Sequence, residues 1–448
     1  MDLAREMAAA AGGDAVVPAE EHALYAADES GVEPGLPDVV VRPADTAGVA
    51  AVLAVAHAHG VPVVPMGART GLAGGAVPRG GGIALSLERL ATVGSVDRAN
   101  LRVTADAGAR TTDVQAAAAA AGFFYPPDPA SLDRSTIGGN IATNAGGPRC
   151  FKYGVTAEYV LALEAVTADG RIFRTGAATR KNATGPRLAQ LLVGSEGTLA
   201  VVTEATLRLV PAPAGRVAAT ASFDSVESAG AAVAAVVAEG LVPSALEVMD
   251  AACLELVGMP AAAALLLVEV DVPDAASVES ELSLVEGALR RAGARTLELA
   301  RNEDGIDELW RARRAVNPAL TAAAPDFLLQ DVCVPPGAIP EALHRIGAIA
   351  KRHRVRIPVF GHAGDGNLHP SVLYDAAAGE AEAAHAAEAE VLRAALALGG
   401  TVSAEHGIGL LKRPFLAESL DPVALELAYA LKRAFDPKGI LNPGKLLP

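Results

Sequence analysis

Three glycine-rich segments in the first half of the chain constrain the fold more than any other feature. Residues 67–75 follow a Val/Pro-rich strand end, residues 135–147 follow a proline-rich stretch, and residues 194–204 place a tight turn before a strand. Because glycine has no Cβ atom, its backbone can approach a ligand closely, and successive N–H groups can converge on an anion. A single loop of this kind is more often a tight turn than a ligand-binding loop. Three in one domain predict a binding site for a flat ligand that carries a phosphate or pyrophosphate.

The spacing within these segments excludes two common nucleotide-binding folds. Residues 67–75 read Gly-Ala-Arg-Thr-Gly-Leu-Ala-Gly-Gly, which matches neither the GxGxxG pattern of Rossmann domains nor the GxxxxGK[ST] pattern of P-loops. The apolar pattern around them predicts a mixed α/β first half, in which strands at 38–42 and 61–65 flank an alanine-rich helix at 46–59. The further elements expected are strands at 83–87, 101–106, 160–167 and 199–209, and helices at 111–121 and 185–192.

A Pro/Gly-rich stretch marks a domain boundary. Residues 211–215 contain two prolines and a glycine, which block both helix continuation and strand pairing. Beyond this stretch, strands alternate with long helices, which predicts a second α/β layer domain. The expected strands lie near 217–223, 264–271, 327–334, 355–361 and 368–373, and the expected helices at 225–239, 276–292, 338–353 and 376–398.

Composition and charge exclude several classes of protein. The 448 residues are 51% hydrophobic and 20% charged, which fits two or three packed domains rather than a disordered chain. The formal net charge of −15, without a lysine or arginine block, excludes a nucleic-acid partner. No apolar run approaches the roughly 20 residues of a membrane-spanning helix. The N-terminus does not read as a secretory signal, so we expect a cytoplasmic protein with three reduced cysteines.

Two histidines in the second half have the context of metal ligands. His362 and His369 flank a Gly-Asp-Gly-Asn turn, so we expect them to lie opposite each other across a hairpin. Directly opposed side chains have Cβ atoms about 4.5–5.5 Å apart, which lets two imidazoles share a metal. Glu405 is the candidate third ligand, and two histidines with one carboxylate leave a position open for substrate. The alternative is that each histidine is an ordinary core or surface residue.

Four segments together resemble a known family. Residues 65–72, 137–147, 194–199 and 435–445 carry the resemblance and occur in this order. They are similar to the FAD-binding pattern of flavoproteins of the vanillyl-alcohol oxidase type. Within that type, the chain resembles the branch that contains D-lactate dehydrogenase, D-2-hydroxyglutarate dehydrogenase and the D-type flavoprotein chain of glycolate oxidase.

The resemblance implies an α+β fold with two parts. One is a two-subdomain FAD-binding domain of the vanillyl-alcohol oxidase type, and the other is a ferredoxin-like α+β substrate domain, or cap. The implied segments are an N-terminal helical segment at 1–35, the FAD-binding domain at 36–213, the substrate domain with the metal site at 214–412, and a C-terminal segment at 413–448 that returns to the FAD domain.

The resemblance also implies which residues contact FAD. The loop at 67–71 would lie on the pyrophosphate, and residues 136–147 would run along the flavin and ribityl chain. The implied contacts come from Pro65, Gly67, Arg69, Thr70, Gly71, Pro127, Thr136, Gly138, Gly139, Thr143, Gly146, Gly147, Glu196, Val202 and Asn442. Some relatives attach the flavin covalently through a histidine near these loops. Because residues 65–75, 126–147 and 194–204 contain no histidine, we expect noncovalent FAD.

Relatives of this branch carry a divalent metal, expected here to be zinc, on the positions that match His362, His369 and Glu405. Flavin N5 can accept a hydride from a 2-hydroxy acid while the metal polarises the hydroxyl oxygen. His406 adjoins a metal ligand and is expected to accept the hydroxyl proton. The alternative is a histidine that only orders its loop. By the family's Leu-Trp-x-x-Arg pattern, Arg313 is the carboxylate clamp.

Two departures from the 2-hydroxyglutarate branch favour a small substrate. That branch has a lysine where residues 328–330 read Leu-Leu-Gln, and an asparagine where Ser371 stands. A second carboxylate then has less to bind, so we expect glycolate or D-lactate to be oxidised to the 2-oxo acid. The alternatives are a D-2-hydroxyglutarate dehydrogenase, a metal hydrolase with a phosphate-binding loop, and a non-redox subunit that binds FAD.

The sequence leaves the partners of this chemistry open. The electron acceptor can be a quinone, an electron-transfer flavoprotein, a cytochrome or a partner subunit. A homodimer, and attachment to the membrane surface through the electron-acceptor partner, are further hypotheses.

Overall fold

The computed structural model describes residues 2–272 and 274–447, which form two compact units. The first unit takes in the described residues of 1–147, 154–212 and 405–448, and the second takes in those of 148–153 and 213–404. None of the helices in the described residues has both the length and the apolar character that crossing a membrane requires. The four functional segments expected from the sequence stay a prediction.

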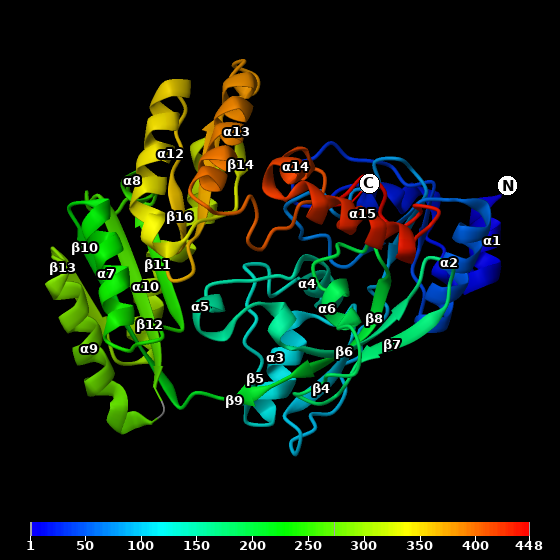
Figure 1. The fold of residues 1–448 in the computed structure, drawn as a ribbon, viewed down its shortest axis with the longest axis horizontal. Helices are drawn as coiled ribbons and strands as arrows, with labels where there is room; N and C mark the ends of the chain where they lie inside the picture. The colour runs from blue at the N-terminus through cyan, green and yellow to red at the C-terminus, as the bar shows by residue number, and fades with distance from the viewer. Residues whose placement is uncertain (1, 273, 448) are drawn as a thin grey trace. The chain divides into compact units, whose positions relative to one another are not determined.

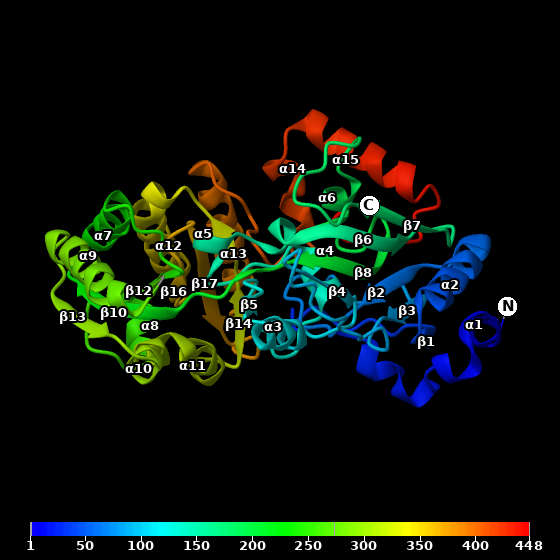
Figure 2. The same cartoon turned by 90° about the horizontal axis from the view of Figure 1, so that it is seen from below.

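Three short parallel strands form one sheet of the first unit, in the order β1-β3-β2. The elements are β1 (Val39–Val41), β2 (Val63–Met66), β3 (Ile83–Ser86), and the helices α1 (Leu3–Ala11) and α2 (Thr46–His59), which pack against each other (Figure 2). α2 begins where the Asp45 side chain accepts a hydrogen bond from the Gly48 N–H, and it ends at Gly60, whose φ of 68° suits glycine. The strand, helix, strand arrangement predicted for this region is confirmed.

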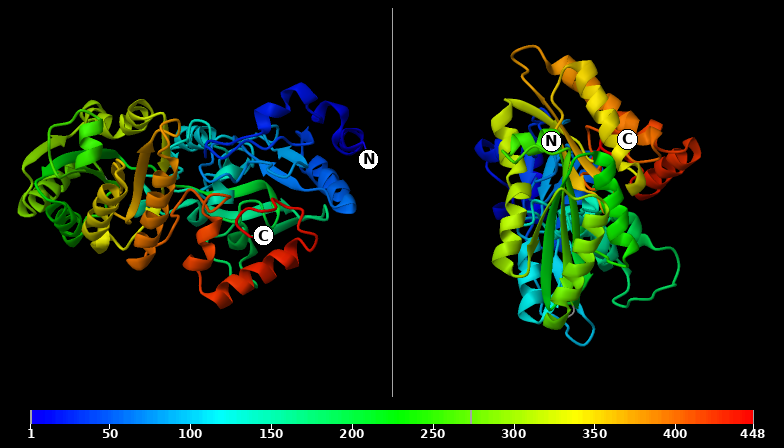
Figure 3. Two further views of the ribbon diagram at one scale, coloured as in Figure 1. Left: turned by 90° about the horizontal axis from the view of Figure 1, so that it is seen from above. Right: turned by 90° about the vertical axis from the view of Figure 1, so that its left-hand side faces the viewer.

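Four antiparallel strands form the second sheet of the first unit, in the order β4-β8-β6-β7. The strands of this sheet and of a separate two-stranded ribbon are β4 (Arg102–Asp106), β6 (Val160–Val166), β7 (Ile172–Gly176), β8 (Val201–Arg208), β5 (Phe123–Phe124) and β9 (Val210–Pro211). The helices of the unit are α3 (Thr111–Ala120), α4 (Ile137–Thr143), α6 (Leu188–Leu192), α14 (Leu416–Ser419) and α15 (Pro422–Phe435), the last drawn in red in Figure 3. β8 alternates buried and half-buried residues, because one face of this antiparallel sheet is covered more completely than the other.

Three details of the first unit differ from the sequence-based expectation. The helix expected at 185–192 begins only at Leu188, because Gly185 and Pro186 stand before it. β7 was not predicted, because its residues are mostly exposed and carry no apolar pattern. Residues 137–143, for which no helix was predicted, form the helix α4, which begins where the Thr136 hydroxyl accepts from the Gly139 N–H.

The second unit begins with a ferredoxin-like arrangement. Its elements are β10 (Gly215–Phe223), α7 (Val226–Ala238), β11 (Ala245–Asp250), α8 (Ala251–Leu256), β12 (Ala264–Val272), α9 (Val278–Arg291) and β13 (Thr296–Ala300). The strands pair antiparallel in the order β13-β10-β12-β11, with α7 and α9 on one face (Figure 1). The ferredoxin-like α+β cap predicted for this half is confirmed, with α8 as an additional helix.

Four further strands extend this sheet to eight. They are β14 (Asp326–Leu329), β15 (Val332–Cys333), β16 (Val359–His362) and β17 (Asn367–Tyr374), and the helices around them are α5 (Cys150–Tyr153), α10 (Glu303–Arg314), α11 (Val316–Ala323), α12 (Ile339–His353) and α13 (Ala381–Ala397). α10 packs through Ile306, Leu309 and Trp310 on Ala218 of β10 and Ala300 of β13, on the opposite face from α7 and α9 (Figure 2). This α10-covered face carries the polar residues discussed below.

Several elements of the second unit begin or end at other residues than the sequence predicted. The strand expected at 327–334 is two short strands, β14 and β15, and the helix expected at 376–398 begins only at Ala381. Residues 375–380 form a turn instead, in which the Asp375 carboxylate accepts from the N–H groups of Ala377 and Ala378. The strands β11 and β13 were not among the predicted elements.

Candidate active site

The three glycine-rich segments meet in the first unit. A Cβ atom on Gly67 would lie 2.3 Å from the Thr136 hydroxyl oxygen, and one on Gly197 would lie 3.1 Å from the ring of Pro65. The loop after β2, the start of α4 and the loop before β8 therefore touch one another. At Gly67 this contact leaves no room for any side chain.

Asn442 connects this cluster to the C-terminal segment. Its side-chain nitrogen donates to the carbonyl oxygens of Gly75, at 3.0 Å, and Glu196, at 2.7 Å. The Glu196 N–H donates in turn to the Ala142 carbonyl in α4, at 2.8 Å. The Asn442 amide thus contacts two of the glycine segments directly and is linked to the third through Glu196.

Glu196 is the charged centre of the cluster. It is buried, and its carboxylate accepts from the N–H groups of Ile408, at 2.7 Å, and Gly409, at 2.8 Å. Burial raises the pKa of Glu196 to about 7, against the opposing effect of these N–H groups and of Lys412 and Lys445. Burial likewise lowers the pKa of Lys445 to about 8.

Some predicted FAD residues have a structural contact of their own. Gly138 packs on Ala107, where a Cβ atom would lie 2.8 Å from the Ala107 methyl group. Gly147 packs on Asp128, where a Cβ atom would lie 2.3 Å from the carbonyl oxygen. The guanidinium of Arg69 lies over the ring of Tyr25, 4.6 Å from its centroid. The remaining residues lie on α4 (Gly139 and Thr143), on β8 (Val202) and on the loops (Thr70, Gly71, Pro127 and Gly146).

The cluster fits a large polar cofactor. A Cβ atom on Gly71 or Gly75 would make only an ordinary van der Waals contact, at 3.7 and 3.8 Å, so there is space for a methyl group beside this backbone although the loop is half-buried. The side-chain oxygen of Asn442 is buried and has no hydrogen-bond partner among the described residues. A bound FAD would fill such space and offer donors to such an oxygen. Direct FAD contact by each named residue stays a prediction.

The histidine pair lies on the second unit, on the hairpin of β16 and β17. His362 pairs with Asn367 and His369 pairs with Phe360, so the two histidines are diagonal neighbours on one face. The prediction that they lie directly opposite each other was wrong, because the turn takes residues 363–366 rather than 364–367. Gly366 makes this turn possible, since its φ is 87° and a Cβ atom would lie 1.8 Å from the Val334 carbonyl oxygen.

The two buried imidazoles face each other through their Nε2 atoms, 3.5 Å apart. The Nδ1 atom of His362 lies 2.5 Å from a Glu247 oxygen, and Nδ1 of His369 lies 3.3 Å from the Gln330 carbonyl oxygen. Both Nδ1 atoms therefore carry the proton, which directs the two Nε2 lone pairs at each other. Such lone pairs repel unless a proton or a cation lies between them. Two tetrahedral ligands about 2.0–2.1 Å from a zinc ion are roughly 3.4 Å apart, so the observed separation fits a shared ion.

Arg313 joins the same group of side chains from α10. Its Nε atom donates to the second Glu247 oxygen at 2.7 Å, and its guanidinium lies 4.4 Å from the centroid of the Phe360 ring. Within the described residues, no group accepts a hydrogen bond from its two terminal nitrogens. They can therefore bind a carboxylate in two parallel hydrogen bonds.

Glu247 belongs to this group of side chains, and sequence reasoning missed it. It is buried, and although burial alone raises the pKa of its carboxyl group, the charges and hydrogen bonds of His362 and Arg313 hold that pKa below its usual value. The one signal in the sequence was a single acidic residue inside the apolar run Ala245-Leu246-Glu247-Val248-Met249. A charged residue at such a position is rare unless it is paired.

Glu405 and His406 begin the last segment of the first unit. They follow Ser403 and Ala404 of the second unit, where the Ser403 hydroxyl donates to the Asp331 carboxylate at 2.7 Å and the Ala404 N–H donates to it at 3.0 Å. Asp331 thus fixes the chain directly before the predicted ligand and base. The roles of Glu405 and His406 stay predictions.

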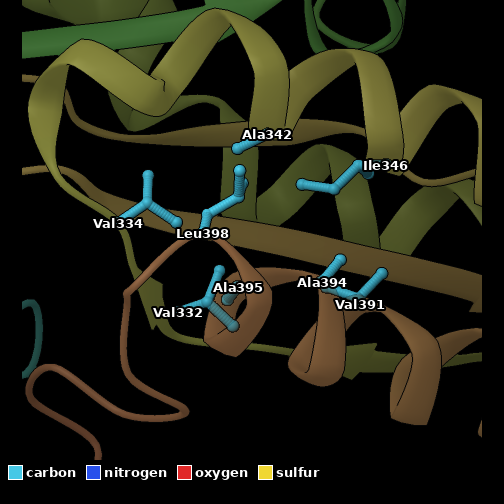
Figure 4. A pocket seen from close by; sticks show the side chains of 8 residues that line it. All are labelled: Val332, Val334, Ala342, Ile346, Val391, Ala394, Ala395 and Leu398. Carbon is cyan, nitrogen blue, oxygen red and sulfur yellow. The ribbon is translucent and has the colours of Figure 1, made fainter.

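A small pocket elsewhere in the second unit has no part in this site. Aliphatic side chains from β15, α12 and α13 line it, including Val332, Ile346 and Val391 (Figure 4). The lining contains no ionisable or metal-binding side chain. It is therefore a gap in helix packing rather than a site for a polar substrate.

Two known protein families match consecutive parts of the chain. An FAD binding domain matches residues 37–176, and the C-terminal domain of FAD linked oxidases matches residues 212–446. The chain belongs to the FAD-linked oxidase family. This FAD-linked oxidase is 39% identical to the glycolate oxidase subunit GlcD of Bacillus subtilis, over 94% of this chain and 92% of that one. It is 38% identical to a D-lactate dehydrogenase of Archaeoglobus fulgidus, over 91% of each chain.

Solved structures confirm the fold of this FAD-linked oxidase. A 4-ethylphenol oxidase from Gulosibacter chungangensis matches with a TM-score of 0.80 at 19% identity, over 100% of this chain and 97% of that one. An alkyldihydroxyacetonephosphate synthase matches with a TM-score of 0.78 at 18% identity, over 99% of this chain and 84% of that one. The predicted α+β fold of the vanillyl-alcohol oxidase type is therefore confirmed. The family match and the relatives above confirm that the chain is an FAD-linked oxidoreductase.

Proposed function

We propose that this FAD-linked oxidase converts a small 2-hydroxy acid of the glycolate or D-lactate type to the 2-oxo acid. The pair of facing Nε2 atoms beside Arg313 carries the proposal, because one face of one sheet then offers a cation for a hydroxyl oxygen and a guanidinium for a carboxylate. The relatives named glycolate oxidase and D-lactate dehydrogenase support the same substrate class.

His362, His369 and Glu405 would hold a divalent metal, with zinc the expected ion. Noncovalent FAD would be bound by the glycine segments of the first unit. When bound, FAD supplies a hydride acceptor at N5 and the metal supplies a Lewis acid for the hydroxyl group. The two Nδ1 partners, Glu247 and Gln330, keep the histidine rings in the tautomer that a metal ligand needs.

The other residues act on the substrate itself. Arg313 would bind the carboxylate through its terminal nitrogens, with its Nε anchored on Glu247. His406 would accept the hydroxyl proton. Ser371, buried on β17, stands where a substrate with a second carboxylate would need a stronger donor, which supports a monocarboxylic acid.

The reduced flavin must pass its electrons to an acceptor. We infer a quinone, an electron-transfer flavoprotein, a cytochrome or a partner subunit, and we keep a homodimer, a cytoplasmic location and attachment to the membrane surface through the acceptor as hypotheses.

An anaerobic titration tests the proposal. Purified protein should show flavin absorbance that bleaches with glycolate or D-lactate, and less readily with L-lactate or D-2-hydroxyglutarate. A flavin-containing protein that no 2-hydroxy acid reduces would contradict the substrate class. A colourless protein that binds metal would favour a metal hydrolase instead.

A further inference from the structure

Glu247 has a contact on each of its carboxylate oxygens. One oxygen lies 2.5 Å from Nδ1 of His362, and the other accepts from Nε of Arg313 at 2.7 Å. The side chain is 1% exposed, so both contacts are made out of water. One carboxylate therefore joins the group assigned to the metal and the group assigned to the substrate carboxylate.

The strand register explains why Glu247 reaches both partners. β11 pairs antiparallel with β16, and Glu247 stands directly opposite His362. Directly opposed residues share one face of a sheet and lie close together. α10 covers this face, which brings Arg313 to the carboxylate oxygen that does not contact His362. The arrangement depends on three elements that are far apart in the sequence.

The chemistry requires the charge and not only the shape of Glu247. A carboxylate accepts at both oxygens, whereas an amide has one accepting oxygen and one donating nitrogen. Glutamine at this position would turn its N–H groups toward either the His362 Nδ1–H or the Arg313 Nε–H. One of the two partners would then lose its acceptor and its fixed orientation.

We propose that Glu247 is a positioning residue that couples the metal site to the carboxylate site. It holds His362 in the tautomer whose Nε2 faces His369. It also holds Arg313 by Nε, so that the two terminal nitrogens of the guanidinium stay available for the substrate carboxylate. The distance between the hydroxyl-binding cation and the carboxylate-binding guanidinium is thereby set by one side chain. This inference rests on the proposed function and names the residue that selects acids with their hydroxyl next to the carboxylate.

Glu269 offers a matched control on the same sheet face. It is also a buried glutamate, on β12, and it accepts hydrogen bonds from Trp310 of α10, at 2.8 Å, and from Arg216, at 3.2 Å. It has no hydrogen bond to His362 or Arg313 in the described residues. Glu269→Gln therefore weakens a buried ion pair with Arg216 of β10 and a hydrogen bond from Trp310 of α10 without touching either partner of Glu247.

The test compares E247Q with E269Q in the full-length holoenzyme. Zinc affinity is measured by competition with a chelator, and KM and kcat are measured with D-lactate and glycolate at saturating zinc. We expect E247Q to lower zinc affinity about 10–100-fold and to raise KM at least about tenfold, with a smaller change in kcat. E269Q should change neither quantity by more than about threefold, although both variants can lower the melting temperature.

Glu247→Asp serves as a second variant should E247Q not fold. It keeps the charge but shortens the side chain by one methylene, so it can reach only one partner at full strength and should show either the zinc effect or the KM effect. If E247Q and E247D both have the same zinc affinity and the same KM as E269Q, the coupling role is overturned while the proposed function stays intact. Wild-type protein that binds no zinc would overturn both proposals.

Discussion

Lys432 and Asp436 form a buried ion pair at the end of α15, with Nζ 2.7 Å from Oδ2. Lys432 also donates to the carbonyl oxygens of Thr198 and Leu441, at 2.8 Å each. Asp436 accepts from the Leu441 N–H at 2.7 Å. The pair thus connects α15 to the loop before β8 and to the residue that precedes Asn442, and it holds the C-terminal motif against the FAD loops.

Replacing Lys432 with methionine should destabilise the protein by about 3–5 kcal/mol, because Asp436 would remain buried without its cation. Urea unfolding of the FAD-loaded protein measures the change. Lys438, which is exposed and within the described residues donates only to the His57 carbonyl, is the control, and K438M should cost less than about 1 kcal/mol. Equal losses in both variants would contradict a special role for the buried pair.

Gly67→Ala should remove most of the bound FAD, because the new methyl group would lie 2.3 Å from the Thr136 hydroxyl and push the loop after β2 from α4. The ratio of flavin to protein absorbance gives the result. Gly80→Ala is the control, since nothing lies within 4 Å of a Cβ atom there. The double variant G67A/T136A should recover part of the flavin, and a failure to do so would argue against this steric explanation.

Glu196 should make stability depend on pH. Its pKa is about 7 in the folded protein and near 4.5 in the unfolded chain, so the folded state binds more protons between these values. Stability is therefore highest below about pH 4.5 and falls as pH rises to about 7, by on the order of 3 kcal/mol. E196Q should lack this loss, so its stability relative to wild type should rise from pH 5 to pH 8. A constant difference across that range would contradict the raised pKa.

Removing metal should stop reduction of the flavin by 2-hydroxy acids while the flavin stays bound. Dialysis against a chelator, followed by addition of zinc, should abolish and restore bleaching with D-lactate. H362N and H369N should behave like the chelated protein, because each removes one of the facing Nε2 atoms. H353N is the control, since His353 contacts only Glu390 of α13 in the described residues, at 2.8 Å. Full activity of the chelated protein would exclude a metal role.

Arg313→Lys should raise KM for the substrate about tenfold or more, a change of about 1.4 kcal/mol or more, because a lysine ammonium cannot bind a carboxylate with two parallel hydrogen bonds. Arg311 lies on the same helix, is exposed and pairs with Glu308. R311K should therefore leave KM unchanged. Steady-state assays with D-lactate and glycolate separate the two variants, and equal KM values would contradict Arg313 as the clamp.

Apolar patterns predicted several elements that face a core, among them α2, whose alanine-rich run is confirmed as a helix. The ferredoxin-like cap was implied by the resemblance and is confirmed by its strand order, although its strands β11 and β13 had not been predicted from an apolar period. β7 was missed, because it is mostly exposed and carries no such period. The histidine hairpin shows a finer limit: a turn that starts one residue earlier converts opposite neighbours into diagonal ones.

Some residues of the candidate site could be identified from the sequence, and one could not. Motif residues such as His362, His369 and Arg313 were identified by resemblance, and the structure brings them together in the second unit. Glu247 belongs to no motif, and its role depends on strand register and on a helix that crosses the sheet. No pattern along the chain encodes such a meeting of β11, β16 and α10.

The chain passes between the two units at four places, after residues 147, 153, 212 and 404. Neither unit is therefore an uninterrupted length of polypeptide. A fragment cut at residue 213 would lose Asn442 and, with it, the amide that bridges the Gly75 and Glu196 carbonyls. Exchanging the second unit between relatives requires grafting 213–404 together with the hexapeptide 148–153, so the two units can be recombined only as interleaved pieces.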